Sequence, residues 1–476
     1  MTKLRSLLRA AAVCFLYSGV AVVSPAQTLN TLATFDYTVS GAGPVYGPLA
    51  QGTDGNFYGT TSSGGANGNG TVFRLTPSGT LTPLYNFCSQ TNCSDGTRPY
   101  AGLVLGTDGN FYGAALTGGA ECPSCRGYGT VFKITADGSL TTLHRFSLRD
   151  GAYPYAPLTQ GADGVFYGTT EAGGTNSGGT IFKITDAGKL TTLHNFEPID
   201  GIQPQAAALL QGSDGEFYGT AYNGGANGRG TIFKVTASGA VTTLYNFCSE
   251  ANCADGASPG AGLVLGNDGN FYGTTEFGGV NAYGTVFQFT PGGTLTTLHT
   301  FDSTDGGYLY TSLVQAADGT LYGTTPSLGA NAFGTAFEIT AGGGFITLYN
   351  FCAQSGCSDG STPLAQLLIG ANGDLYGETQ GGGNDNAGTI FSLAVGLGPT
   401  VSTLPASGNV GASVRILGMN MAGATAVSFN GTPASFTVVS RSLIKAFVPV
   451  GATAGRVQVT TPSGTLTSNA VFPVIP

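Results

Sequence analysis

The chain has 476 residues, of which only 9% are charged, and a formal net charge of −9. This acidic balance argues against nucleic acids and anionic membrane surfaces as partners. Glycine contributes 79 residues and no long helical periodicity follows residue 26, so the composition favours short strands joined by turns.

The first 26 residues have the pattern of a secretory signal peptide. Three basic residues precede an apolar run at 10–23, and small residues at 24–26 offer a cleavage site before Gln27. An uncleaved anchor is the alternative, but the run is shorter than the ~20 residues that a membrane span needs. Cleavage leaves 17 − 3 = 14 basic against 26 acidic residues, or −12. We therefore expect a secreted or cell-surface protein with no transmembrane segment after cleavage.

One short stretch, Asp-Gly-Asn-Phe-Tyr-Gly at 54–59, returns along most of the chain. The copies begin 54, 55, 51, 54, 50 and 54 residues apart, a period that is typical of repeat architectures. The seven copies begin at Asp54, Asp108, Asp163, Asp214, Asp268, Asp318 and Asn372.

Each repeat predicts four short antiparallel strands. In the second repeat these are the apolar or alternating runs at 101–105, 110–115, 130–135 and 139–146, separated by turns and by one long loop. Seven such units predict an all-β fold, a seven-bladed β-propeller of four-stranded blades.

The ends of the repeat region predict that the ring closes on itself. The last repeat lacks a fourth strand after Leu393, whereas residues 29–35 match the fourth-strand register of residues 81–87. A blade built from both termini removes exposed sheet edges, so we expect residues 27–396 to form the closed propeller. Its tight turns should lie on one face and its long loops on the other, where function usually resides.

A different β pattern begins after the Gly- and Pro-rich joint at 395–399. Its short, closely spaced strands predict a small immunoglobulin-like β-sandwich over residues 397–476. The expected strands are 414–417, 426–429, 436–439, 443–448 and 457–461.

Eight cysteines remain after signal cleavage, in four close pairs. Repeat intervals that contain a pair are 54 or 55 residues long and the others are 50 or 51, so each pair lies in an insertion. An even count in an exported chain favours disulfides. For the CxxC pair, Cys122 and Cys125, the alternative is a redox site or half of a zinc site. The expected disulfides are Cys88–Cys93, Cys122–Cys125, Cys248–Cys253 and Cys352–Cys357.

Residues that recur in most repeats are best interpreted as structural. Two aspartate series, one in the DGxFYG turn and one in a DGxxP loop, could form rings of calcium ligands, but neither motif supplies several oxygens at close spacing. Turn capping is the favoured interpretation. The three histidines, His144, His194 and His299, share a fourth-strand register with tyrosines, which argues against a catalytic or metal role.

Positions that vary within the uniform frame are the candidate site. One series follows the second strand and the other follows the inter-blade proline, so both should lie on the long-loop face near the innermost strands. Tyrosine beside carboxylate and amide groups suits sugar recognition, whereas solvated loop residues are the alternative. The candidates are Tyr100, Tyr155, Tyr222, Tyr310, Glu171, Glu276 and Gln380.

Catalysis has weaker support than binding. Glu171 and Glu276 are the acidic pair of the first series and could act as acid and base on a glycoside. No Ser/His/Asp arrangement, phosphate loop or zinc motif supports another chemistry, and no cofactor or metal is expected.

The repeat consensus, DGNFYGTT, GGxNxxGTVFKIT, LTTLYNF and DGxxP, resembles the exported GloVer repeat family, also described as choice-of-anchor proteins, over residues 28–395. The resemblance implies a surface-exposed propeller-like body of undefined activity, with no catalytic residues to carry over. Many members end in a sorting tail with an apolar span, and residues 471–476 do not resemble one. Residues 399–474 resemble an IPT/TIG domain, which implies a spacer or interaction module.

These observations predict a non-catalytic module that binds an extracellular glycan or a surface protein through its long-loop face. A glycan-cleaving hydrolase or lyase and a purely structural surface repeat are the alternatives.

Overall fold

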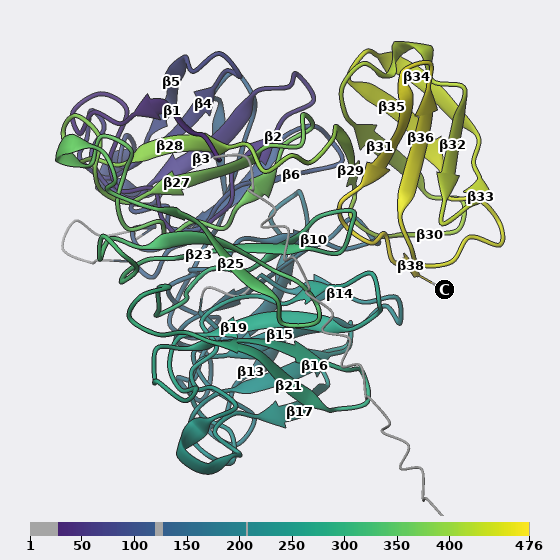
Figure 1. Cartoon of the computed structure of the whole chain (residues 1–476). Coiled ribbons are helices and arrows are strands. Elements are labelled where there is room, and N and C mark those ends of the chain that lie inside the picture. Colours follow the sequence, from purple (N-terminus) through teal and green to yellow (C-terminus); the bar gives the residue numbers. More distant parts are fainter. Residues whose placement is uncertain (1–26, 120–126, 206–207, 476) are drawn as a thin grey trace, which may run out of the picture.

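The computed structural model describes residues 27–119, 127–205 and 208–475. Within these ranges the elements are β-strands and four short 3-10 turns, with no α-helix. Seven four-stranded sheets form the blades of a β-propeller, and a separate β-domain follows (Figure 1). The predicted all-β, seven-bladed propeller is confirmed. The predicted signal peptide at 1–26 lies outside the described residues.

Each blade has a two-residue innermost strand followed by three longer strands. In blade 1 these are β2 (Ala50–Gln51), β3 (Phe57–Thr61), β4 (Thr71–Leu75) and β5 (Leu81–Asn86). Blades 2 to 4 consist of β6 (Val104–Leu105), β7 (Phe111–Ala115), β8 (Thr130–Ile134), β9 (Leu140–Arg145), β10 (Thr159–Gln160), β11 (Phe166–Thr170), β12 (Thr180–Ile184), β13 (Leu190–Asn195), β14 (Leu210–Gln211), β15 (Phe217–Ala221), β16 (Thr231–Val235) and β17 (Val241–Asn246).

Blades 5 and 6 repeat this pattern, and blade 7 takes its fourth strand from the N-terminus. They consist of β18 (Val264–Leu265), β19 (Phe271–Thr275), β20 (Thr285–Phe289), β21 (Leu295–Thr300), β22 (Val314–Gln315), β23 (Leu321–Thr325), β24 (Thr335–Ile339), β25 (Phe345–Asn350), β26 (Leu368–Ile369), β27 (Leu375–Thr379), β28 (Thr389–Leu393) and β1 (Leu29–Thr34).

Aromatic pairs from the Phe-Tyr-Gly motif hold neighbouring blades together. The Tyr58 ring lies 4.2 Å from that of Phe111 in the next blade, and the Tyr112 ring lies 3.9 Å from Phe166. A glycine follows each Phe-Tyr pair because a Cβ at that position would clash with a phenylalanine of the same blade. At Gly59 the Cβ would lie 2.4 Å from Phe73. The aromatic pair recurs at five of the seven interfaces, and leucine takes the place of phenylalanine at the other two, as Leu321 and Leu375.

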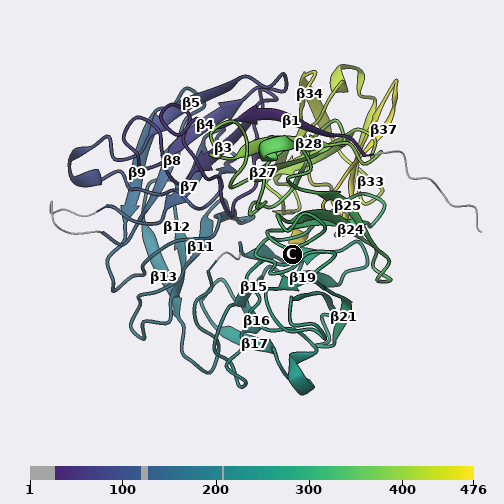
Figure 2. The same cartoon turned by 60° about the vertical axis from the view of Figure 1, so that its left-hand side comes forward.

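The ring closes as the sequence predicted. Strand β1 pairs antiparallel with β28, with Leu29 opposite Leu393 (Figure 2). The Tyr376 ring of the last blade lies 4.4 Å from Phe57 of the first, which continues the interblade packing across the junction.

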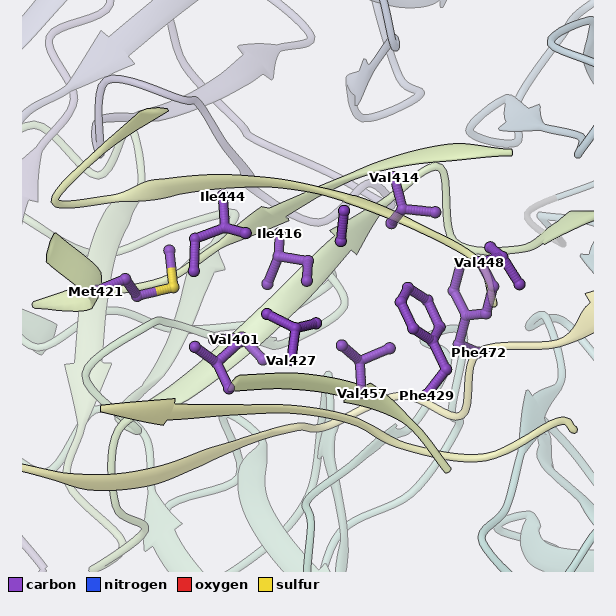
Figure 3. Close-up of a cluster of buried hydrophobic side chains, with 12 residues drawn as sticks. Val401, Val414, Ile416, Met421, Val427, Phe429, Ile444, Val448, Val457 and Phe472 are labelled. Carbon is purple, nitrogen blue, oxygen red and sulfur yellow. The ribbon is translucent and has the colours of Figure 1, made fainter. Parts of the chain in front are cut away.

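The C-terminal domain is one curled sheet wrapped around its own core. Val414, Val427 and Ile444 are fully or almost fully buried among the side chains shown in Figure 3. Its eight-stranded sheet runs in the order β33-β32-β36-β37-β29-β31-β35-β34, with β30 and β38 as a separate parallel pair. The strands are β29 (Thr400–Leu404), β30 (Gly408–Asn409), β31 (Ser413–Leu417), β32 (Ala426–Phe429), β33 (Thr432–Pro433), β34 (Phe436–Ser440), β35 (Leu443–Phe447), β36 (Val457–Thr461), β37 (Gly464–Ser468) and β38 (Val474–Ile475).

This domain rests on the tight-turn face of the propeller. Ser442 Oγ donates to the Thr53 carbonyl in blade 1 at 3.4 Å, and Ser407 Oγ donates to Gln211 Oε1 in blade 4 at 2.6 Å. Arg456 Nη2 donates to the Ala316 carbonyl in blade 6 at 2.9 Å. These contacts reach turns on opposite sides of the ring, so the long-loop face is the one that the domain leaves uncovered.

Three of the four predicted disulfides are confirmed. Cys88–Cys93, Cys248–Cys253 and Cys352–Cys357 each join residues five apart, in the insertions between blades. The fourth pair, Cys122 and Cys125, lies outside the described residues. The inserted loops are therefore held in place by local covalent links.

Candidate functional site

The aspartates of the DGxFYG turns are caps for those turns, as predicted. In blade 1 the Asp54 carboxylate accepts the Tyr58 hydroxyl at 2.8 Å and the Asn56 backbone N–H at 3.1 Å. The same contacts recur in blade 2 around Asp108. In five of the blades the aspartate therefore ties its turn to the interblade tyrosine.

The DGxxP aspartates bind the fourth strand, a pairing that the sequence analysis missed. The fully buried Asp95 accepts the Tyr85 hydroxyl at 2.8 Å, whereas Asp150 accepts His144 Nε2 at 3.0 Å. Tyrosine and histidine can replace one another at this register because each can donate a hydrogen bond from the far end of its ring to the aspartate carboxylate. Burial alone would raise the pKa of Asp150, but its hydrogen bonds to His144 and Ser147 leave that pKa below the ordinary value. All three histidines therefore belong to the scaffold.

A tyrosine cluster lies where the long-loop face meets the innermost strands. Tyr46, Tyr100, Tyr155 and Tyr310 precede β2, β6, β10 and β22 respectively, and all four are partly exposed. The Tyr46 ring lies at the centre, with ring centroids 5.8 Å from Tyr100, 5.9 Å from Tyr155 and 6.3 Å from Tyr310. Tyr100 and Tyr155 also meet edge to face at 5.4 Å. The closed propeller thus brings together side chains from blades 1, 2, 3 and 6.

Glu276 fixes the other side of this cluster. It follows β19, is only 3% exposed, and accepts hydrogen bonds from the hydroxyls of Tyr222 and Tyr310, one on each carboxylate oxygen. Burial raises the pKa of Glu276 even though both phenol hydrogen bonds act to lower it. Gly260 lies against both rings, since a Cβ there would be in van der Waals contact with the Tyr310 ring at 3.5 Å and the Tyr222 ring at 3.8 Å.

Glu171 is the second carboxylate beside the cluster. It follows β11, is partly exposed, and its pKa is raised by burial. The pKa of Tyr155 is raised first by burial and then by the charge of Glu171. The pKa of Tyr46 is raised by burial, then by Tyr100 and Glu276, and then by Glu171. Within the described part of the chain, no hydrogen bond reaches the Glu171 carboxylate. It is therefore an acceptor that a ligand can use.

The predicted site residues fall into two groups. The structure brings together Tyr100, Tyr155, Tyr222, Tyr310, Glu171 and Glu276. Gln380 is exposed, and among the described residues neither a ring contact nor a hydrogen bond joins it to the cluster. Tyr46 was absent from the candidate list although it occupies the same register as Tyr100 and Tyr155, and that register could have identified it.

The chemistry of the cluster suits holding a ligand. Burial, aided by neighbouring carboxylates, raises the pKa of Tyr155, Tyr222 and Tyr310 well above the ordinary value, so these phenols are neutral at physiological pH. Both oxygens of Glu276 are already engaged by phenols, which positions this carboxylate rather than leaving it free for proton transfer. Within the described ranges, no group of three or more His, Cys, Asp or Glu side chains could hold a metal ion.

Comparison with solved structures shows the fold. A fungal alcohol oxidase of the AA5 family, solved in complex with copper, is 13% identical with a TM-score of 0.51, over 94% of this chain and 99% of that chain. The extracellular domain of a putative one-component system from B. thetaiotaomicron is 11% identical with a TM-score of 0.45, over 93% of this chain and 52% of that chain. The likeness to the first of these structures shows the fold alone.

No curated protein matches the chain. Among the described residues there is no helix of the length and apolar character needed to span a membrane. The Gloeobacter/Verrucomicrobia repeat model matches residues 17–211 and 199–391, and the C-terminal domain lies beyond this match, so its likeness to IPT/TIG domains stays a prediction. Because these repeats cover well over half of the chain, the protein belongs to the Gloeobacter/Verrucomicrobia repeat (GloVer) family.

Proposed function

We propose that the protein is an exported binding module that holds an extracellular glycan or surface partner through the tyrosine cluster, without turning it over. The observation that carries this proposal is the meeting of five tyrosines and two carboxylates from six blades at one place on the long-loop face. The recurring polar groups elsewhere in the blades cap turns or hydrogen-bond the DGxxP loop to the fourth strand.

The physical properties of the cluster support glycan recognition. Tyrosine offers a rigid ring for stacking on the apolar face of a sugar, together with a hydroxyl that can donate or accept. Glu276 holds Tyr222 and Tyr310 in fixed orientations, so little side-chain entropy is lost when a ligand binds. Glu171 adds an acceptor without a partner in the described chain.

The same proposal assigns a role to each part of the chain. Residues 1–26 direct export, residues 27–396 carry the binding face, and residues 397–476 act as a spacer that covers the opposite face. The contacts of Ser442, Ser407 and Arg456 with the tight turns support this division.

A glycan array followed by product analysis on every hit tests this function. We expect retention of at least one glycan with no change in its length. Products that disappear in Glu171→Gln or Glu276→Gln would establish a glycan-cleaving enzyme instead. If no glycan or cell-surface material is retained, the structural repeat becomes the better account.

A further inference from the structure

The free hydrogen-bonding capacity of the cluster is dominated by acceptors. Glu276 contributes a buried carboxylate whose two oxygens each hold a phenol, and Glu171 contributes a partly exposed carboxylate with no hydrogen-bond partner among the described residues. A carboxylate can only accept when ionised. A ligand that meets Glu171 must therefore present a donor.

The charges around the cluster point to a cationic donor. Burial raises the pKa of Tyr46, Tyr155 and Tyr310, which keeps their rings neutral with electron-rich faces. Arg98 is the basic residue whose charge acts on this group, and it is exposed beside Tyr155 rather than bonded to Glu171. Two carboxylates therefore face the same aromatic group with one cation at its edge.

Aromatic rings and a carboxylate together recognise ammonium groups. A cation over a tyrosine face is attracted by the electron-rich ring, and a charge-assisted hydrogen bond to a carboxylate is roughly twice as strong as a neutral one. Tyr46 contacts Tyr100, Tyr155 and Tyr310, so one ammonium beside Glu171 would lie close to several rings.

We propose that the ligand is an amine-bearing glycan, with a protonated amino sugar whose ammonium binds Glu171 and whose apolar ring face stacks on the tyrosine cluster. This inference rests on the proposed function and narrows its ligand class. The hydroxyls of the same glycan have the phenols of Tyr100 and Tyr155 as partners, since neither phenol has a hydrogen-bond partner in the described chain.

The test is calorimetric titration of the full mature chain with three oligosaccharides of equal length. These are the glucosamine hexamer, the N-acetylglucosamine hexamer and cellohexaose, each titrated at several pH values near neutrality so that the series includes protonated glucosamine. We expect the glucosamine hexamer to bind at least about tenfold more tightly than either neutral sugar. We expect Glu171→Gln to abolish this preference.

An acidic protein attracts any polycation, so a matched control is needed. Glu250→Gln removes one exposed glutamate from a disulfide loop of blade 4 and should leave the preference unchanged. Equal loss in both variants, or a preference that survives Glu171→Gln, would overturn the amine assignment. Equal binding of all three hexamers would overturn it as well while leaving the glycan function intact, and binding of none would count against both proposals.

Discussion

One residue of blade 7 departs from the pattern at a buried position. Glu378 occupies the place in β27 where five other blades carry threonine, and it is 2% exposed. Threonine there donates across the blade interface, as Thr60 does to the Ala101 carbonyl at 3.0 Å. Glu378 Oε1 has no partner among the described residues. Burial raises the pKa of Glu378 well above its ordinary value.

This carboxyl predicts a fall of stability with rising pH. The unfolded pKa of glutamate is about 4.3, so above it the folded state holds a proton that the unfolded state has lost. The contribution of Glu378 to the free energy of unfolding is fully present below the unfolded-state pKa and is lost as the pH rises through the folded-state pKa. We expect the free energy of unfolding of Glu378→Gln to equal that of the wild type at about pH 4. At about pH 8 we expect it to be higher than that of the wild type by about 1 kcal/mol or more.

Urea unfolding of both proteins across this range measures the difference between their free energies of unfolding. Because the chain contains 26 acidic residues, only that difference is informative. The exposed Glu197→Gln serves as the control and should give a flat difference. A flat difference for Glu378→Gln would show that the side chain is ionised and solvated in the folded state.

At the scale of the element, the N-terminal strand closes the ring. Leu29 is 8% exposed and Phe35, just after β1, is 1% exposed with its ring 5.2 Å from Phe73 of blade 1. Burying two such side chains contributes about 3–6 kcal/mol, in addition to the strand pairing. Deletion of residues 27–36 should therefore lower the thermal midpoint markedly, as measured by calorimetry.

The control for that deletion is Asn30→Ser, because Asn30 is an exposed residue of the same strand. It should leave the midpoint almost unchanged. An unchanged midpoint for the deletion itself would mean that β1 does not hold blade 7 and blade 1 together.

The cysteine insertions predict four local disulfides in the exported protein. Three are present in the structure, and Cys122–Cys125 follows from the same association of a cysteine pair with a longer repeat interval. Peptide mapping without reduction should recover all four as links within single loops. Free thiols at Cys122 and Cys125 together with bound zinc would favour the metal interpretation of that pair.

The repeat made most of the fold predictable, because a recurring turn motif and a recurring Phe-Tyr-Gly or Leu-Tyr-Gly motif specify similar packing in each blade. The cluster was only partly predictable. Tyr46 and Tyr310 are far apart in the sequence, and their contact depends on closure of the propeller. The hydrogen bond between His144 and Asp150 was not predicted, because the spacing of the two motifs differs between repeats: histidine precedes its aspartate by six residues and tyrosine precedes its aspartate by ten.

At the scale of the whole molecule, charge is divided between the two parts. All 26 acidic residues precede residue 397, and the C-terminal domain carries four basic residues and no acidic one. Burial lowers the pKa of Arg456 to about 10, while Asp318 in blade 6 favours its charged form. Elsewhere between the two parts, a cleft of about 720 Å³ is lined by Arg415 and Lys445 of the C-terminal domain and by Asp163 of the propeller. This complementarity agrees with the docking of the domain on the tight turns, which the sequence pattern alone did not predict.

The central claim is that the tyrosine cluster is the binding site. The most direct measurement is the affinity of the mature chain for its best array glycan, compared among the wild type, Tyr155→Ala, Tyr310→Ala and Tyr85→His. The last is a matched control, because Tyr85 lies on the fourth strand where three other repeats carry histidine. We expect each alanine variant to weaken binding by about tenfold or more, as stacking contacts of about 1.4 kcal/mol require, and Tyr85→His to bind like the wild type. Unchanged affinity in both alanine variants, with their thermal midpoints preserved, would contradict the account.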